Sequence, residues 1–160
     1  RDIVERAVAK RLFARAARQN VLAPLGLADR VEALLAQRCR DALGLARRAG
    51  LAVGGFEKVR EAVRAGKAGL LFEALDAAEG GRRKLRAVGR GLPVAAVLAA
   101  AEIGAAFGRD HIVHAAIGRG PLCRRLIADA ERIVGFRPRA TVDCGMKSVP
   151  ATPDHGIGPR

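Results

Sequence analysis

The chain has 160 residues and a strongly positive charge, with 29 lysines and arginines against 16 acidic residues and a net charge of +13. Such an excess of cations is typical of domains that bind a polyanion, most often nucleic acid. The three cysteines, odd in number and widely spaced, argue against a disulfide framework and for a reducing, cytoplasmic compartment, and the sequence has neither a CxxC pair nor an apolar run of the roughly 18 residues that a membrane span needs.

The N-terminal part predicts a basic amphipathic helix followed by a break. Apolar residues recur at helical spacing from Asp2 to Arg18, with arginine and lysine on the opposite face. Such a helix fits either a membrane surface or, more commonly, a helix packed on a domain with its charged face in water, and we favour the second. Pro24 and Gly26 interrupt the pattern. A second, long helix is then predicted from Leu27 to Gly50.

Short apolar strands alternate with helices through the rest of the chain up to Phe136. The predicted strands span 51–53, 70–75, 94–98 and 112–117, and the predicted helices span 56–65, 82–89, 100–107 and 122–134. This alternation predicts an α/β fold, a three-layer α/β/α sandwich around a largely buried sheet, preceded by helices. Glu73 interrupts one strand and is expected where one face opens. From Arg137 to Arg160 the sequence holds four prolines and no periodicity, and we expect a disordered tail.

The stretch from Leu43 to Asp76 carries the clearest binding signal. Gly54 and Gly55 separate a predicted strand from a predicted helix, where glycine permits positive φ angles and the close approach of another molecule. The free N–H groups of a helix start, flanked by cations, form a phosphate site. The flanking cations are Arg47, Arg48, Lys58, Arg60, Arg64 and Lys67, and a second basic group in the helix at 82–89 comprises Arg82, Arg83, Lys84 and Arg86. Cations at 47 and 48 also suit the end of a helix dipole.

Catalytic side chains are scarce before the predicted tail. The only serine and both threonines lie in that tail, and the chain has no tyrosine. His111 and His114 are three residues apart, so if they lie on one strand they point to opposite faces and do not bind one metal together. Neither a P-loop nor a dinucleotide fingerprint occurs. We therefore expect no enzyme activity, no metal and no cofactor.

The basic residues favour recognition of RNA shape over base sequence. Arginine neutralises phosphates, forks onto guanine and stacks on bases. Amides that read base edges are few, with one asparagine and two glutamines, Asn20, Gln19 and Gln37. This balance suits structured RNA better than a sequence-specific duplex DNA reader.

Four blocks of sequence carry a family resemblance. They are LGLARRAG at 43–50, GGFEKVREAVRAGKAGLLFEALDAA at 54–78, LPVAAVLAAAEIGAAFG at 92–108, and the strand and helix at 112–134. In this order they resemble the ribosomal L-seven-Ae/L-thirty-e superfamily, especially its small bacterial YlxQ-like branch. The resemblance implies an α/β/α sandwich that binds RNA, typically a kink-turn or ribosomal RNA.

The resemblance also implies where RNA lies. In that family it contacts the turn and helix start equivalent to Gly54–Lys58 and the loop equivalent to Gly108–Val113, which adds Arg109 and His111 to the site. Kink-turn binders carry an Asn-Glu pair and a following Lys, and by spacing these positions fall at Glu57, Lys58 and Glu61. The kink-turn grip is therefore absent, and a general RNA-binding role is the expectation.

The stretch from Ala7 to Leu35 resembles the end of a YlxR-type domain, a small domain associated with nucleic-acid binding and with genes of transcription and translation. Its cysteine-bearing part would lie before Arg1, so we expect a trimmed fusion. The expected domains are a partial YlxR-like segment at 1–36, an L-seven-Ae/L-thirty-e-like RNA-binding domain at 37–136, and the tail at 137–160.

Together these features predict an RNA-binding accessory protein of the ribosome or transcription machinery, linked to translation or transcription termination. The alternative is a basic protein-interaction module that docks an acidic partner of the same machinery. The expected RNA-binding residues are Arg47, Arg48, Gly54, Gly55, Phe56, Glu57, Lys58, Arg60, Arg82, Arg83, Lys84, Arg109 and His111.

Overall fold

The computed structural model describes residues 1–145, which form seven helices and five strands. The helices are α1 (Asp2–Ala9), α2 (Leu12–Ala17), α3 (Leu27–Arg48), α4 (Phe56–Arg64), α5 (Glu79–Val88), α6 (Ala100–Phe107) and α7 (Pro121–Val134). The strands are β1 (Ala52–Gly54), β2 (Ala68–Ala74), β3 (Val94–Leu98), β4 (His114–Gly118) and β5 (Thr141–Asp143). None of these helices is both long and apolar enough to cross a membrane.

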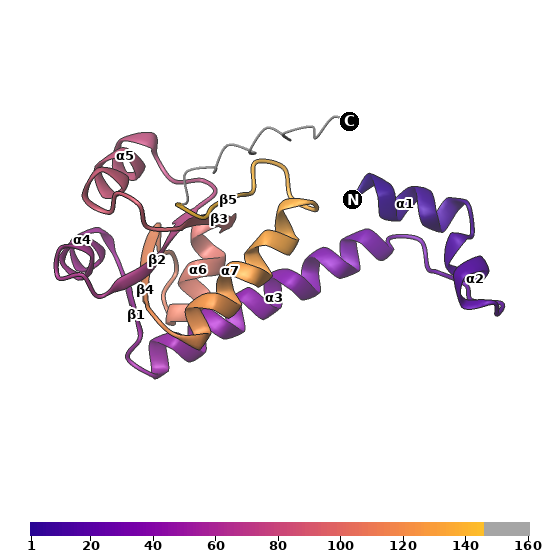
Figure 1. Cartoon of the computed structure of the whole chain (residues 1–160), viewed down its shortest axis with the longest axis horizontal. Coiled ribbons are helices and arrows are strands. Elements are labelled where there is room, and N and C mark those ends of the chain that lie inside the picture. The colour runs from indigo at the N-terminus through magenta and orange to yellow at the C-terminus, as the bar shows by residue number, and fades with distance from the viewer. Residues whose placement is uncertain (146–160) are drawn as a thin grey trace, which may run out of the picture.

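The strands form one mixed sheet in the order β1-β4-β2-β3-β5. Only β2 and β3 are parallel, and the other three neighbouring pairs are antiparallel. Helices α4 and α5 cover one face of the sheet, and α3, α6 and α7 cover the other (Figure 1). The predicted three-layer α/β/α sandwich is thus confirmed.

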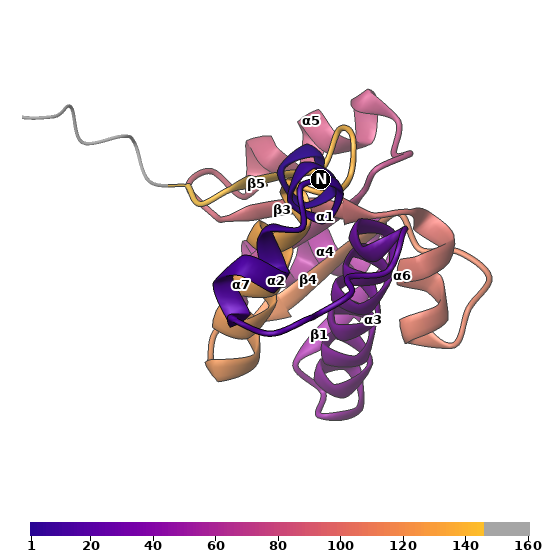
Figure 2. The ribbon, with the colours of Figure 1, turned by 90° about the vertical axis from the view of Figure 1, so that its right-hand side faces the viewer.

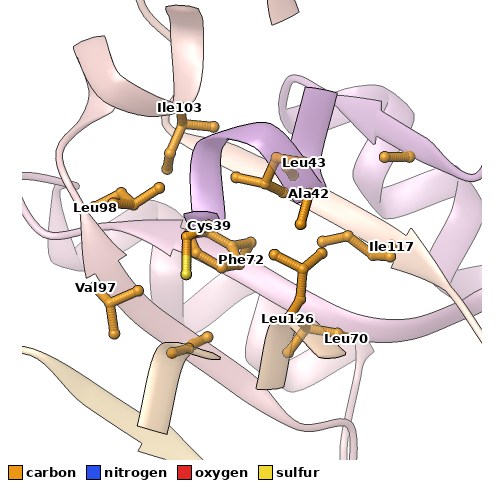
Figure 3. Close-up of a cluster of buried hydrophobic side chains, with 14 of the residues drawn as sticks. Cys39, Ala42, Leu43, Leu70, Phe72, Val97, Leu98, Ile103, Ile117 and Leu126 are labelled. Carbon is orange, nitrogen blue, oxygen red and sulfur yellow. The ribbon is translucent and has the colours of Figure 1, made fainter. Parts of the chain in front are cut away.

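The larger core lies between the sheet and helices α3, α6 and α7. Leu43, Phe72, Ile103 and Leu126 meet there without exposed surface (Figure 3). A smaller core on the opposite face contains Leu71, next in sequence to Phe72. Side chains of a strand alternate between faces, so a strand covered on both sides must be apolar throughout. This explains the apolar run Leu70–Phe72 in β2, which Glu73 then interrupts.

The predicted single helix from Asp2 to Arg18 is wrong. Helix α1 ends at Ala9, and α2 begins at Leu12 after Arg11, whose φ of 52° is left-handed. The apolar spacing runs across this break, so periodicity did not reveal it. Both helices lie beside the N-terminal end of α3, beyond the sandwich (Figure 1), and we call residues 1–26 the N-terminal arm. The Arg1 amino group ties the arm to α7 by donating to the Gly135 carbonyl, at 2.7 Å.

The sheet extends into the predicted tail. β5 pairs with β3 at the edge of the sheet (Figure 2), so the prediction of disorder from Arg137 is wrong for the residues up to Gly145. The tail beyond Gly145 lies outside the described residues. A three-residue edge strand is too short to show alternation, which is why the sequence pattern missed it.

Two element boundaries change the surroundings of the candidate residues. β4 begins at His114 rather than at Ile112, so His111 lies in the preceding loop and the two histidines do not share a strand. α5 begins at Glu79 and contains Gly80 and Gly81, which the sequence placed before the helix. His111 therefore lines a cavity with Gly54 and Gly55, and Gly81 packs against His114.

Candidate nucleic-acid interface

The glycine turn joins β1 to α4. Gly54 pairs with Ala115 of β4, and a Cβ atom at Gly54 would lie only 2.7 Å from Cδ1 of Ile112. Gly55 has a φ of 101°, which disfavours residues with a side chain, and its N–H donates to the His114 carbonyl at 2.8 Å. α4 starts directly after it at Phe56. The two glycines are therefore needed for different reasons, space at Gly54 and backbone conformation at Gly55.

Three cations converge beside this turn. Arg47 from the end of α3, Lys58 from the first turn of α4 and Arg109 from the loop after α6 line a cavity of about 260 Å³ with Gly54 and Ile112. All three side chains are exposed, and none has an ion-pair partner among residues 1–145. Uncompensated cations at a helix start concentrate positive potential where an anion can approach.

A second cavity adjoins the first. Its volume is about 390 Å³, and it shares Gly54, Arg109 and Ile112 with the first cavity. Phe56 and His111 add a ring each to its lining. Aromatic rings beside arginine can stack a nucleobase, so the two cavities together offer phosphate and base contacts.

Other residues predicted to bind RNA lie outside these two cavities or already form contacts within the protein. Arg48 lines a separate groove between α3 and α6. Arg60 pairs with Glu57 and lies 6.0 Å from the centre of the Phe56 ring. Arg82 turns inward and donates to the backbone carbonyls of Ala74 and Leu75. Its side chain therefore links α5 to the C-terminal end of β2.

Arg83 and Lys84 are exposed on α5. No side-chain hydrogen bond or ion pair engages either of them within residues 1–145. They remain free to contact a polyanion.

A group of ionisable side chains, Glu73, Arg86 and His114, lies behind the glycine turn and was not predicted from the sequence. Glu73, expected where a face opens, is 1% exposed, and its carboxylate accepts from Arg86 Nη2 at 2.7 Å. This hydrogen bond outweighs burial and raises the pKa of Arg86.

His114 faces Glu73 in the antiparallel register of β4 and β2. Burial lowers the pKa of His114, with Glu73 acting in the opposite sense. A lone glutamate inside an apolar strand was the signal available in the sequence.

Metal and thiol chemistry have little support in this part of the chain. Among residues 1–145, no group of three or more His, Cys, Asp and Glu side chains could hold a metal ion. Burial raises the pKa of the Cys39 thiol to about 12, which disfavours the nucleophilic thiolate.

Comparisons with known proteins support the fold. No protein-family model and no curated protein matches the chain. Among solved structures, a protein with unknown function from Bacillus halodurans C is 29% identical, with a TM-score of 0.54. The match covers 57% of this chain and 94% of that one. It therefore shows a similar fold over just over half of this chain and brings no activity with it.

Proposed function

We propose that this protein binds structured RNA at the glycine turn, as an accessory protein of the ribosome or transcription machinery. One observation carries the proposal: Arg47, Lys58 and Arg109, from three separate segments, line one cavity at the start of α4 and have no ion-pair partner among residues 1–145. A helix N-terminus beside three cations suits phosphate groups.

The family resemblance supports the same surface. It implies RNA contacts at Gly54–Lys58 and at Gly108–Val113, and these segments touch where Gly54 approaches Ile112. Glu57 and Glu61 are exposed acidic residues where a kink-turn binder has Asn and Lys. Their charge repels a phosphate backbone, so we propose a structured RNA other than a standard kink-turn.

Fluorescence anisotropy with a labelled RNA hairpin containing an internal loop tests the proposal. The variant combines Arg47→Ala, Lys58→Ala and Arg109→Ala. Its control combines Arg6→Ala, Arg90→Ala and Arg124→Ala, exposed residues outside both cavities that remove the same charge. We expect the site variant to weaken binding at least about tenfold more than the control and to flatten the salt dependence. Equal losses in both variants, or no binding by the wild type at low salt, would reject the proposal.

A second candidate function, docking of an acidic protein partner, is favoured by the N-terminal arm. Ile3, Leu22 and Leu25 are 82%, 75% and 94% exposed there, among several arginines. Exposed apolar side chains beside cations suit a protein surface with acidic and apolar residues. Capture of a partner that survives nuclease treatment and is lost on Leu22→Ser with Leu25→Ser would support this function.

A further inference from the structure

We infer that His114 is a positioning residue for the proposed RNA site and that its protonation is coupled to RNA binding. The inference rests on the proposed function and deepens it. It concerns a residue that lines one cavity of the site and is only 6% exposed.

His114 connects the glycine turn to three other parts of the fold. Its carbonyl accepts the Gly55 N–H at 2.8 Å, and its ring meets Phe56 edge to face, with ring centres 6.0 Å apart. On α5, Gly81 leaves room for the imidazole, because a Cβ there would lie 2.9 Å from Nε2. Glu73 is its register partner on β2. Movement of this ring would therefore be felt at Phe56, while the His114 backbone holds Gly55.

The imidazole is held by packing rather than by hydrogen bonds. Its Nδ1 atom is buried and has no hydrogen-bond partner among the described residues. Two charged groups act on the ring, Glu73 from β2 and Arg82 from α5, while α4 presents the uncharged Phe56. Arg82 Nε, also buried, lies 3.8 Å from the Glu73 carboxylate and has no hydrogen-bond partner within residues 1–145. The surroundings thus favour neutral His114 in the free protein but contain a carboxylate that can stabilise the imidazolium.

A bound polyanion changes this balance. A proton on His114 places a positive charge in the cavity wall, directly behind the turn where the phosphates are proposed to lie. Because this charge attracts the RNA, protonation of His114 should raise the affinity for RNA. By linkage, bound RNA should raise the affinity of His114 for the proton by the same factor. RNA affinity should therefore rise as the pH falls through the titration of His114.

Anisotropy titrations at about pH 8 and about pH 5 test the coupling, and the lower value is chosen because burial lowers the pKa of His114. The wild type is compared with His114→Gln, and with His111→Gln as a control for the exposed histidine of the same cavity. We expect the gain in affinity at the lower pH to be about fivefold larger in the wild type than in His114→Gln. His111→Gln should keep that His114-dependent gain. An equal gain in wild type and His114→Gln would overturn the inference.

NMR of the wild-type protein tests the same coupling without depending on a variant that folds. The His114 ring signals are followed by NMR against pH, with and without the same RNA hairpin, and we expect RNA to raise the midpoint. An unchanged midpoint with RNA bound would reject the coupling and leave RNA binding intact. Absence of binding at both pH values would instead reject the proposed function itself.

Discussion

Arg137 and Glu102 form a two-point ion pair between the segment that follows α7 and the first turn of α6. Arg137 Nη1 donates to Glu102 Oε2 at 2.6 Å, and Nη2 donates to Oε1 at 2.9 Å. The same guanidinium donates to the Val97 carbonyl of β3 and to Glu32 of α3, each at 3.0 Å. One side chain thereby links α3, α6 and the sheet to the segment that leads into β5.

Replacing Arg137 with alanine should destabilise the fold by about 2 kcal/mol, because Glu102 and Glu32 would lose a partly buried partner. Urea unfolding followed by circular dichroism measures the change. Arg124→Ala, which removes an exposed arginine of α7, is the matched control and should alter stability by less than about 0.5 kcal/mol. Similar losses in the two variants would show that Arg137 contributes no more than a surface charge.

The contacts of Arg137 explain where sequence reasoning succeeded and failed. β3 and α6 fall at the residues predicted from local apolar patterning, 94–98 and 100–107. Arg137 was assigned to a disordered tail because its neighbours show no periodicity. Its partners lie 35, 40 and 105 residues away in the sequence, and local patterns carry no information on such contacts.

Some residues of the candidate site could be predicted from local sequence, and others could not. Gly54, Gly55 and Lys58 were predicted because the glycine turn and its cations are adjacent in sequence. The link between Glu73 and His114 depends on the register of β2 with β4, which no short stretch specifies. Arg82 was predicted as a surface cation, yet its inward contacts with the Ala74 and Leu75 carbonyls arise from the docking of α5 on the sheet.

The stability of the fold should fall in acid partly through Glu102. Burial raises the pKa of this carboxyl, but hydrogen bonds from Arg137 and from the Ala99 N–H, with the nearby charges, outweigh burial and lower it below 4.5. Because the pKa of Glu102 is lower in the folded than in the unfolded protein, its carboxylate stabilises the fold at pH values above the unfolded-state pKa. This stabilisation is lost as the pH falls through the folded-state pKa. Urea unfolding from neutral pH down to about pH 3 should therefore show a weaker loss for Glu102→Gln than for the wild type. Parallel curves would contradict the role of this pair.

The close packing at Gly54 gives a test with a built-in rescue. Gly54→Ala should destabilise by about 1–3 kcal/mol, because its Cβ would lie 2.7 Å from Ile112 Cδ1 and 3.2 Å from Phe107 Cε1. Ile112→Val removes the Cδ1 atom, so the double variant should be more stable than the sum of the two single losses predicts. Thermal unfolding of the four proteins measures this. Additive losses would mean that the Ile112 side chain does not limit the space at Gly54.

Gly80 and Gly81 of α5 should respond to alanine with opposite signs. No atom of residues 1–145 lies within 4 Å of a Cβ at Gly80, so Gly80→Ala should stabilise by about 0.5–1 kcal/mol through helix propensity. A Cβ at Gly81 would lie 2.9 Å from His114 Nε2, and because that ring is hemmed in by Phe56, Gly81→Ala should destabilise by about 1 kcal/mol. Urea unfolding gives the two values, and NMR of the His114 ring should shift only in the second variant. Stabilisation by both substitutions would show that the imidazole can move away from α5 without cost.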